Sequence, residues 1–433
     1  MRRQRALRAL LWLAVAGGAQ ALRFSSKGSL KVVQATDLHF GEAAEADAAT
    51  VKLLRDVLPA EQPDLVVLSG DQVSGYAIPA ANLVERVRLR LDTTSLSGSW
   101  YEQQWRQLTA PLHEAGVPYA SILGNHDGEA DLSRREVMAL DAATGSSLSL
   151  SRAGPASLSG AGNYWVDVLA PGNSTQVAAR LWFLDSGNRG CNGGAAGWSC
   201  LGRDVVEWVR QQAALLPRVP SLAFVHIPIP QFSEAWSSGA PANGTKGEET
   251  GCPLADTGFF AVAKEFGIHA IYSGHDHDND FAVELEGVRL AYGRKTGFGG
   301  YGPFNVQRGA RVIELRMGED TAQSATWIRQ QDGTRVVQQP VQEPRPHRQA
   351  GCPSIEGRCD KLLGPKACLT LRGWRNGAEA VGALLASLAV LSLTVIAGLV
   401  ASRHALQHLR HRRGWRKLEG AAAAKHPAPD SQV

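Results

Sequence analysis

The chain has 433 residues and a net charge of +4, with 44% hydrophobic and 20% charged residues, a composition that excludes a wholly disordered chain. The positive charge is confined to the two ends. Four Arg lie in the first eight residues and the segment after Ser402 has a net charge of +5, which leaves −5 for the residues between. This acidic middle has no basic surface for nucleic acid, so no nucleic-acid partner is expected.

Residues 1–21 have the pattern of a secretory signal peptide. The four Arg precede an apolar stretch at residues 9–16, and Ala19-Gln20-Ala21 offers the small residues of a cleavage site. An uncleaved anchor is the alternative, but a membrane span needs about 20 apolar residues. The mature protein is therefore expected to begin at Leu22.

Residues 22–335 are predicted to form one α/β domain, because short β-branched runs alternate with amphipathic helical stretches. Asp204 and Glu207 have capping-box spacing and predict the start of a helix. Val205, Trp208 and Val209 then fall on one face of that helix. The predicted strands are residues 30–35, 65–68, 119–123, 164–168, 181–184, 222–225, 270–272, 288–291 and 312–315.

The C-terminal part predicts a membrane anchor. Residues 336–378 are rich in Pro and Gln, contain Cys, and are interpreted as a stalk. Residues 379–402 follow as a transmembrane helix, since they include an uncharged stretch of about 22 residues. A buried core helix is the alternative, but such a helix would carry a polar stripe, which this segment lacks. Residues 403–433 form a basic tail, and the positive-inside bias places it in the cytoplasm. The chain is thus expected to be a single-pass type I membrane protein of the secretory pathway, with its domain lumenal or extracellular.

Six cysteines in a secreted domain are best interpreted as disulfide partners. Cys191 and Cys200 bracket a Gly-rich loop and are expected to pair, whereas the sequence leaves the partners of the other four open. Asn173-Ser174-Thr175 and Asn243-Gly244-Thr245 match the N-glycosylation signal. These features agree with the secretory interpretation.

Five apolar runs end in residues that bind metals. Loops at the carboxyl ends of strands converge in open α/β sheets, so these residues can share one site. Carboxylate, imidazole and amide ligands without thiolate suit Mn, Fe or Zn. Two such ions can hold both the attacking and the leaving oxygen of a phosphoryl displacement. A lone His after a strand is usually a packed residue, so the interpretation depends on the ordered set. The set is Asp37 and His39, Gly70-Asp71, Gly124-Asn125-His126-Asp127, His226, and Gly274-His275-Asp276-His277.

Over residues 32–315, this ordered set resembles the calcineurin-like metallophosphoesterase superfamily. Shorter stretches at residues 162–164, 183–187, 224–230, 243–247 and 274–281 resemble its purple acid phosphatase-like branch of plants, algae and fungi. Several members of that branch are named as inactive.

The resemblance implies a four-layer αββα sandwich of two mixed sheets and two divalent or trivalent metal ions, with metal-bound hydroxide as the nucleophile. One ion would take Asp37, His39, Asp71 and His277, and the other Asp71, Asn125, His226 and His275. Asp71 is also the best candidate for the shared carboxylate on chemical grounds, because the preceding glycine permits close approach of the backbone. His126 would lie beside the phosphate, with Asp127 orienting its ring.

The chain departs from true purple enzymes at two positions. His39 stands where those enzymes have glycine, and Ser74 stands where they have a ligating tyrosine. Tyr76 is two positions too late for that role. No charge-transfer colour is expected, and the metal pair need not include ferric iron.

Two functions remain in competition. The first is metal-dependent hydrolysis of a phosphoester substrate, and the second is a catalytically silent, membrane-tethered binding or scaffolding protein. The sequence leaves the oligomeric state open. Arg294 and Lys295, in a glycine-rich segment, could contact a phosphate or be structural, and Asp276, Asp278 and Asp280 could support the His pair or form a solvated acidic loop.

Overall fold

The computed structural model describes residues 21–341, apart from 81, 83–97, 193, 195–196 and 303–305, together with residues 351–352. The chain divides into two units, Met1–Glu356 and Gly357–Val433, and all described residues belong to the first. The predicted membrane helix and tail, and residues 1–20 of the predicted signal peptide, lie outside the described residues. Within the described part, the helices are too short or too polar to cross a bilayer.

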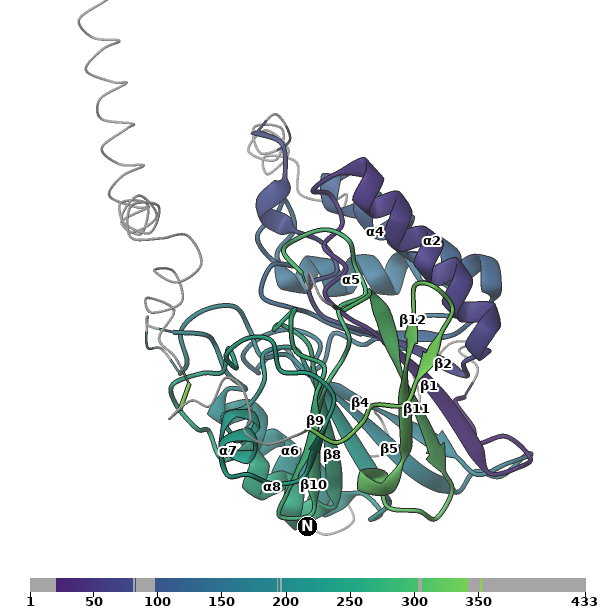
Figure 1. Ribbon diagram of the computed structural model, residues 1–433, viewed down its shortest axis with the longest axis vertical. Coiled ribbons are helices and arrows are strands. Elements are labelled where there is room, and N and C mark those ends of the chain that lie inside the picture. The colour runs from purple at the N-terminus through teal and green to yellow at the C-terminus, as the bar shows by residue number, and fades with distance from the viewer. Residues whose placement is uncertain are drawn as a thin grey trace, which may run out of the picture. The chain divides into compact units, whose positions relative to one another are not determined.

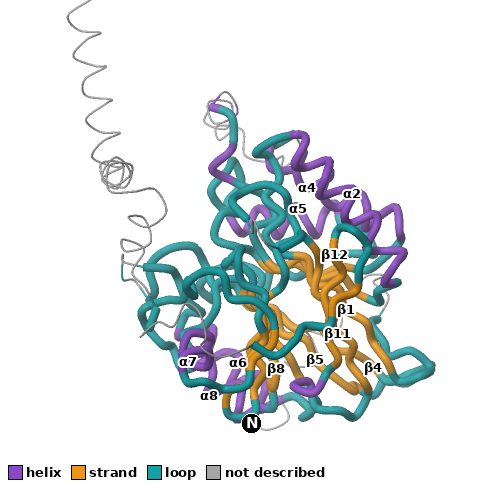
Figure 2. Tube along the Cα trace, in the orientation of Figure 1, coloured by secondary structure: helices purple, strands orange, loops and turns teal. Residues whose placement is uncertain are grey.

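Two mixed sheets form the centre of the domain (Figures 1 and 2). The six-stranded sheet has the order β13-β12-β11-β1-β2-β3, and the seven-stranded sheet has the order β4-β5-β6-β8-β10-β9-β7. The first sheet contains β1 (Ser29–Ala35), β2 (Leu65–Ser69), β3 (Tyr119–Ile122), β11 (Gly309–Arg316), β12 (Ala325–Gln330) and β13 (Arg335–Val336). The second contains β4 (Tyr164–Leu169), β5 (Val177–Leu184), β6 (Ser221–Val225), β7 (Ala242–Asn243), β8 (Ile268–Ser273), β9 (Ala282–Leu285) and β10 (Val288–Tyr292).

Helices cover the outer face of each sheet (Figure 1). The six-stranded sheet carries α2 (Ala44–Glu61), α4 (Trp100–Ala115) and α5 (Arg134–Thr144). The seven-stranded sheet carries α6 (Arg203–Leu215), α7 (Gln231–Ser237) and α8 (Phe259–Phe266). The 3₁₀ helices are η1 (Gly75–Ala77) and η2 (Thr321–Gln323).

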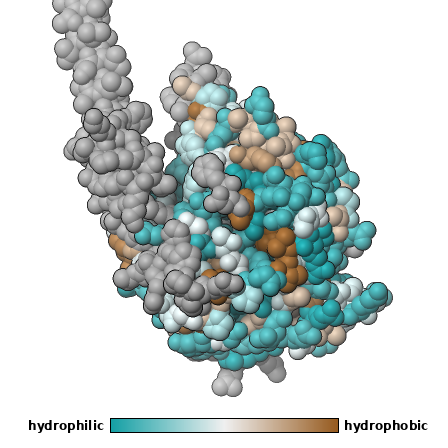
Figure 3. Space-filling view, viewed as in Figure 1, coloured by the Kyte–Doolittle hydropathy of each residue, from teal (hydrophilic) through white to brown (hydrophobic). Residues whose placement is uncertain are grey.

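The two-residue period of β6 shows how the layers pack. Leu222 and Phe224 join the hydrophobic cluster that reaches the strands of the other sheet, whereas Ala223 and Val225 join the cluster beneath α6, α7 and α8. The visible described surface is mostly hydrophilic, with hydrophobic residues in small separate groups (Figure 3). The expected four-layer αββα sandwich is confirmed.

All nine predicted strands are present, but four strands were missed. β9 and β10 form a hairpin through Glu286 and Gly287, which both have positive φ, as a type I′ turn requires. Glu is an unusual first residue for that turn, so the sequence did not indicate a hairpin here. β7 and β13 have two residues each, too few for a periodic pattern.

The helix at Asp204 is confirmed, but the predicted capping box is wrong. Gly202 is the N-cap of α6 and gives it no side-chain cap. The Asp204 carboxylate instead accepts hydrogen bonds from the backbone N and the Oγ of Ser159, at 2.6 Å each. A distant loop thus takes the oxygens that a capping box would have used.

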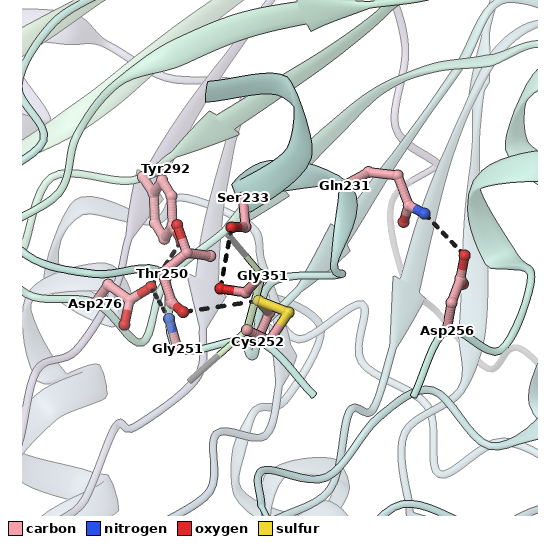
Figure 4. Close-up of a disulfide and its surroundings, with 10 residues drawn as sticks. Gln231, Ser233, Thr250, Gly251, Cys252, Asp256, Asp276, Tyr292 and Gly351 are labelled. Carbon is pink, nitrogen blue, oxygen red and sulfur yellow. Dashed lines mark hydrogen bonds between the residues drawn. A yellow bond between two sulfur atoms is a disulfide. The ribbon is translucent and has the colours of Figure 1, made fainter. Parts of the chain in front are cut away.

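Two disulfides are present among the described residues. Cys191–Cys200 is confirmed, and the second joins Cys252 to Cys352, 100 residues later (Figure 4). Cys359 and Cys368 lie outside the described residues.

Several described residues of the predicted stalk contact the domain. Residues 336–341 were assigned to the stalk, yet Val341 N donates to Ala242 O at 2.8 Å and Pro340 pairs with Asn243. Farther on, Gly351 O accepts a hydrogen bond from Ser233 Oγ at 3.4 Å, beside the Cys252–Cys352 bond (Figure 4). The start of the predicted stalk therefore lies on the domain.

Replacing Glu61 should destabilise the domain. Its buried carboxylate accepts hydrogen bonds from Arg329 Nε at 2.6 Å and Trp327 Nε1 at 3.1 Å, which ties the end of α2 to β12. Glu61→Ala leaves both donors without this acceptor and should lower the free energy of unfolding by about 2–4 kcal/mol. Urea unfolding measures the change. The exposed Glu45→Ala, on the same helix, should stay within about 0.5 kcal/mol, and equal effects of the two variants would contradict this role.

Candidate metal centre

The ends of five strands from both sheets gather the candidate residues. β1, β2 and β3 are neighbours in the six-stranded sheet, and β6 and β8 are neighbours in the other. The strands lead into the candidates as follows: β1 into Asp37 and His39, β2 into Asp71, β3 into Asn125, His126 and Asp127, β6 into His226, and β8 into His275 and His277.

Asp37, His39 and His277 form the first group, with one donor atom from each lying within 4.8 Å of the others. The Nε2 atoms of His39 and His277 are 3.1 Å apart, and Asp37 Oδ1 is 3.4 Å from His277 Nε2. All three side chains are buried. Two imidazole nitrogens and a carboxylate oxygen therefore face one small volume.

Asp71, His226 and His275 form the second group under the same distance limit. Asn125 Oδ1 joins them, at 3.2 Å from His226 Nε2 and 2.8 Å from His275 Nδ1. These four side chains are also buried.

Asp71 lies between the two groups. Its Oδ2 atom is 3.2 Å from His226 Nε2 in the second group and 3.7 Å from His39 Nε2 in the first. One carboxylate oxygen therefore reaches both volumes, as a carboxylate shared by two metal ions must.

In three of the candidate His, the hydrogen bond made by Nδ1 shows which ring nitrogen faces the site. His226 Nδ1 donates to Ser69 O at 2.9 Å, and His277 Nδ1 donates to Tyr301 O at 2.6 Å. A carbonyl only accepts, so Nδ1 carries a proton in both residues and Nε2 is the nitrogen that faces the site. His39 Nδ1 lies 2.7 Å from Ser74 Oγ. Metal-binding His commonly have such partners, so these residues fit metal ions.

The charges of the site also fit cations. Burial would raise the pKa of Asp37, but His277, His226 and Lys295 outweigh it and hold that pKa well below its usual value. Burial and the charge of Lys295 lower the pKa of His277 to about 3, so its imidazole is neutral. Burial lowers the pKa of His226, yet Asp71 and Asp37 raise it to about 9. Ionised buried carboxylates thus stabilise positive charge at this point, which a metal ion would supply.

The backbone at the site is strained. Among the described residues, only eight other than glycine have positive φ, and four of these are Asp37 (54°), His39 (53°), Asp71 (50°) and His275 (78°). The backbones also approach closely, since a Cβ on Gly70 would lie 2.2 Å from His226 Nδ1. No larger residue fits there.

His126 lies next to the two groups and is more accessible than they are. Its side chain is 24% exposed, and its ring centre is 5.7 Å from that of His39. Burial lowers its pKa, but the charges of Asp71 and Glu129 outweigh this and raise the pKa above its usual value. The imidazolium form is therefore favoured.

The prediction that Asp127 orients His126 is wrong. The Asp127 carboxylate accepts from Val73 N at 3.0 Å, Gly124 N at 2.7 Å and the Tyr101 hydroxyl at 2.9 Å. These bonds hold the loop after β3. The His126 ring is held by Glu129, whose Oε2 is 2.6 Å from His126 Nδ1.

Ser74 supports His39 where purple enzymes have a tyrosine. Its hydroxyl contacts His39 Nδ1 and donates to Glu42 Oε1 at 2.5 Å. Tyr76 also donates its hydroxyl to Glu42, and Gly300 N donates to the other oxygen at 2.7 Å. Glu42, which no sequence motif singled out, thus connects the loops around the first group.

The basic pair of the glycine-rich segment is structural. Arg294 is buried and forms an ion pair with Asp280. Lys295 is buried and donates to Asp37 O at 3.0 Å, and burial lowers its pKa to about 7.

The acidic residues around the last His pair do not form a solvated loop. Asp280 is buried with Arg294, and Asp276 is buried and accepts from the Tyr292 hydroxyl at 2.7 Å and Gly251 N at 2.8 Å (Figure 4). Asp278 N donates to Glu248 Oε1 at 3.0 Å. These contacts anchor the loop that carries His275 and His277.

Two aromatic residues that sequence reasoning missed pack on the candidate His. The Tyr301 ring stacks on that of His277 with 4.0 Å between centres. The Trp198 ring meets that of His275 edge to face at 4.3 Å. No sequence motif pointed to either residue, because each lies in a loop that is distant in sequence from the His it contacts.

Comparison with curated proteins finds related phosphatases. The chain is 30% identical over 338 residues to "Probable inactive purple acid phosphatase 28" of Arabidopsis thaliana, covering 69% of this chain and 78% of that protein. It is 26% identical over 343 residues to "Phosphatase DCR2" of Saccharomyces cerevisiae, covering 72% of this chain and 55% of that protein.

Among solved structures, a dimetal phosphatase from Danio rerio matches with 14% identity and a TM-score of 0.41, covering 69% of this chain and 98% of that one. A family model described as calcineurin-like phosphoesterase matches residues 30–279, more than half of the chain. The chain belongs to the calcineurin-like phosphoesterase family, in the branch of its purple acid phosphatase-like relatives.

Proposed function

We propose that the domain hydrolyses phosphoesters with the help of two bound metal ions. The observation that carries this proposal is the position of Asp71 Oδ2, within 3.7 Å of an imidazole nitrogen in each of two buried donor groups. A structural histidine cluster does not require a shared carboxylate of this kind. Family membership supports a phosphoesterase, and the donor set supports two ions of Mn, Fe or Zn.

In this proposal, each donor group holds one ion and Asp71 belongs to both. Asp37, His39 and His277 complete the first set. Asn125, His226 and His275 complete the second. Bound ions would activate water and neutralise charge on the phosphoryl oxygens. The chain supplies rigid, buried ligands, so little reorganisation is needed when the charge develops.

His126 is proposed as the acid of the reaction. It is the partly exposed residue beside two buried groups, and Asp71 and Glu129 favour its protonated form. A protonated imidazole there can stabilise negative charge on the phosphate and give its proton to the leaving oxygen.

A catalytically silent binding or scaffolding protein is the second candidate. The relatives named "Probable inactive purple acid phosphatase" favour it, whereas the yeast relative is named a phosphatase. The donor set of this chain has all seven candidate ligands in place, which favours turnover.

We further propose that the chain is a single-pass type I membrane protein with residues 379–402 as its span and a lumenal or extracellular domain. Two disulfides among the described residues support an oxidising compartment. Asn173 and Asn243 are both exposed and accessible to glycosylation. The signal-like residues 1–21 and the basic tail 403–433 support the same orientation.

Replacing Asp71 or His126 should separate metal binding from chemistry. Asp71→Asn should lower metal content below two ions per chain and abolish turnover, because both groups lose their shared carboxylate. His126→Ala should keep both ions and lower kcat by about 10²- to 10⁴-fold. Metal analysis of the purified protein and a panel of phosphomonoesters and phosphodiesters, assayed with added Mn or Zn, measure both effects.

The exposed Asp56→Asn serves as the matched control and should change neither metal content nor kcat. Wild-type protein that binds two ions but turns over no phosphoester would favour the silent binding protein. Protein that binds no metal would contradict both the site and the proposed function.

Glycan mapping tests the proposed location. In a eukaryotic host, Asn173→Gln and Asn243→Gln should each remove one endoglycosidase-sensitive increment of mass, because both sequons would face the lumen. Asn192→Gln, in an exposed position outside a sequon, should remove none. Protein with no glycan and fully reduced cysteines would contradict a lumenal domain.

A further inference from the structure

The His126 ring has a carboxylate partner three residues later in the chain. Glu129 Oε2 lies 2.6 Å from His126 Nδ1, and both side chains are about one quarter exposed. A carboxylate accepts and does not donate when ionised, so the proton of this bond lies on Nδ1. The other ring nitrogen, Nε2, is then left for the substrate.

A second bond holds Glu129 itself. Its Oε1 atom accepts a hydrogen bond from Asn188 Nδ2 at 2.8 Å. Both carboxylate oxygens therefore have partners, one on each side, and the carboxylate cannot rotate away from His126 without losing the Asn188 bond. Asn188 is 59 residues from Glu129 in the sequence.

Asn188 stands at the base of a disulfide-closed hairpin, of which residues 188–192, 194 and 197–200 are described. Ser199 N donates to Asn188 O at 3.2 Å, and Gly190 N donates to Gly197 O at 3.1 Å. The Cys191–Cys200 bond closes the same loop. The hairpin meets the site at a second place, because Trp198 packs against His275.

We propose that Glu129 is the positioning residue for His126 and that Asn188 holds Glu129 in place, so that the disulfide-closed hairpin belongs to the catalytic apparatus. This inference rests on the proposed function. Glu129 fixes the plane of the imidazole and keeps the proton on Nδ1, and Nε2 delivers the proton that the leaving oxygen takes up when the P–O bond breaks.

The effect of losing Glu129 should depend on whether the leaving group needs a proton. An alkoxide leaves poorly unless it is protonated, whereas 4-nitrophenolate leaves without a proton. Loss of Glu129 should therefore slow an alkyl phosphoester more than an aryl phosphoester. A purely structural role would slow both equally.

Kinetics of the metal-loaded full-length protein test this. Glu129→Gln keeps an acceptor but loses the charge, and Glu129→Ala loses both. For an alkyl phosphomonoester, kcat should fall by about 10-fold in the first and about 100-fold in the second, with KM changed less than about twofold. For 4-nitrophenyl phosphate, kcat should fall less than about threefold, and metal content should not change. Asn188→Ala should follow the same pattern more weakly.

Glu114→Ala is the matched control, since Glu114 is an exposed glutamate outside the site whose carboxylate pairs with Arg55 rather than with a histidine. It should leave both substrates unaffected. Equal losses on the two substrates, or no loss in the Glu129 variants, would overturn the proposal.

A readout without turnover separates this inference from the proposed function. In protein labelled with ¹⁵N-histidine and studied at a pH at which the ring is neutral, the His126 signal, identified by its absence in His126→Gln, should report a proton on Nδ1 in the wild type and a changed tautomer ratio in Glu129→Ala. If no phosphoester is hydrolysed, the proposed function fails while a changed ratio still supports the positioning contact. An unchanged ratio overturns that contact whether or not the protein is active.

Discussion

The site depends on left-handed backbone at residues that carry metal-binding side chains. Positive φ occurs at Asp37, His39, Asp71 and His275, each of which lies two to four residues after the end of its strand. Each such residue costs of order 1–3 kcal/mol. The cost is offset because the strained loops bond to one another: Asp37 N donates to Gly70 O and His39 N to Asp71 O, both at 3.0 Å. The strand ends are therefore fixed as one unit rather than as separate loops.

The same interlocking gives the two halves of the site different surroundings. The first group has charged neighbours, because Lys295 lies buried beneath Asp37 and Glu42 holds Ser74 beside His39. The aromatic contacts also differ, because Tyr301 stacks on His277 of the first group whereas Trp198 meets His275 of the second group edge to face. Residues that contact metal ligands tune affinity and reactivity, so the two metal positions are not equivalent.

Nine of the strands and the seven candidate ligands could be predicted because both are local signals: an apolar run, then a polar residue at its end. The residue that holds the His126 ring could not be predicted in this way. Asp127 and Glu129 are both close to it in sequence, and the choice depends on Tyr101, Val73 and Gly124, whose bonds occupy both Asp127 oxygens. Burial of Asp276 and Asp280 likewise depends on Tyr292, Gly251 and Arg294, which only the folded chain brings near. Linear motifs thus specify which residues meet, but not what holds them.

The Cys252–Cys352 bond determines how the domain can be detached from the rest of its chain. Cys252 is fully buried, and its neighbour Gly251 bonds to Asp276, between His275 and His277. A protease that cuts between Val341 and Gly351 would leave the domain covalently joined, through this bond, to Cys352 and all that follows it. Release of the intact domain from the residues after Cys352 therefore requires either a cut beyond Cys352 or a cut before it together with reduction of the disulfide.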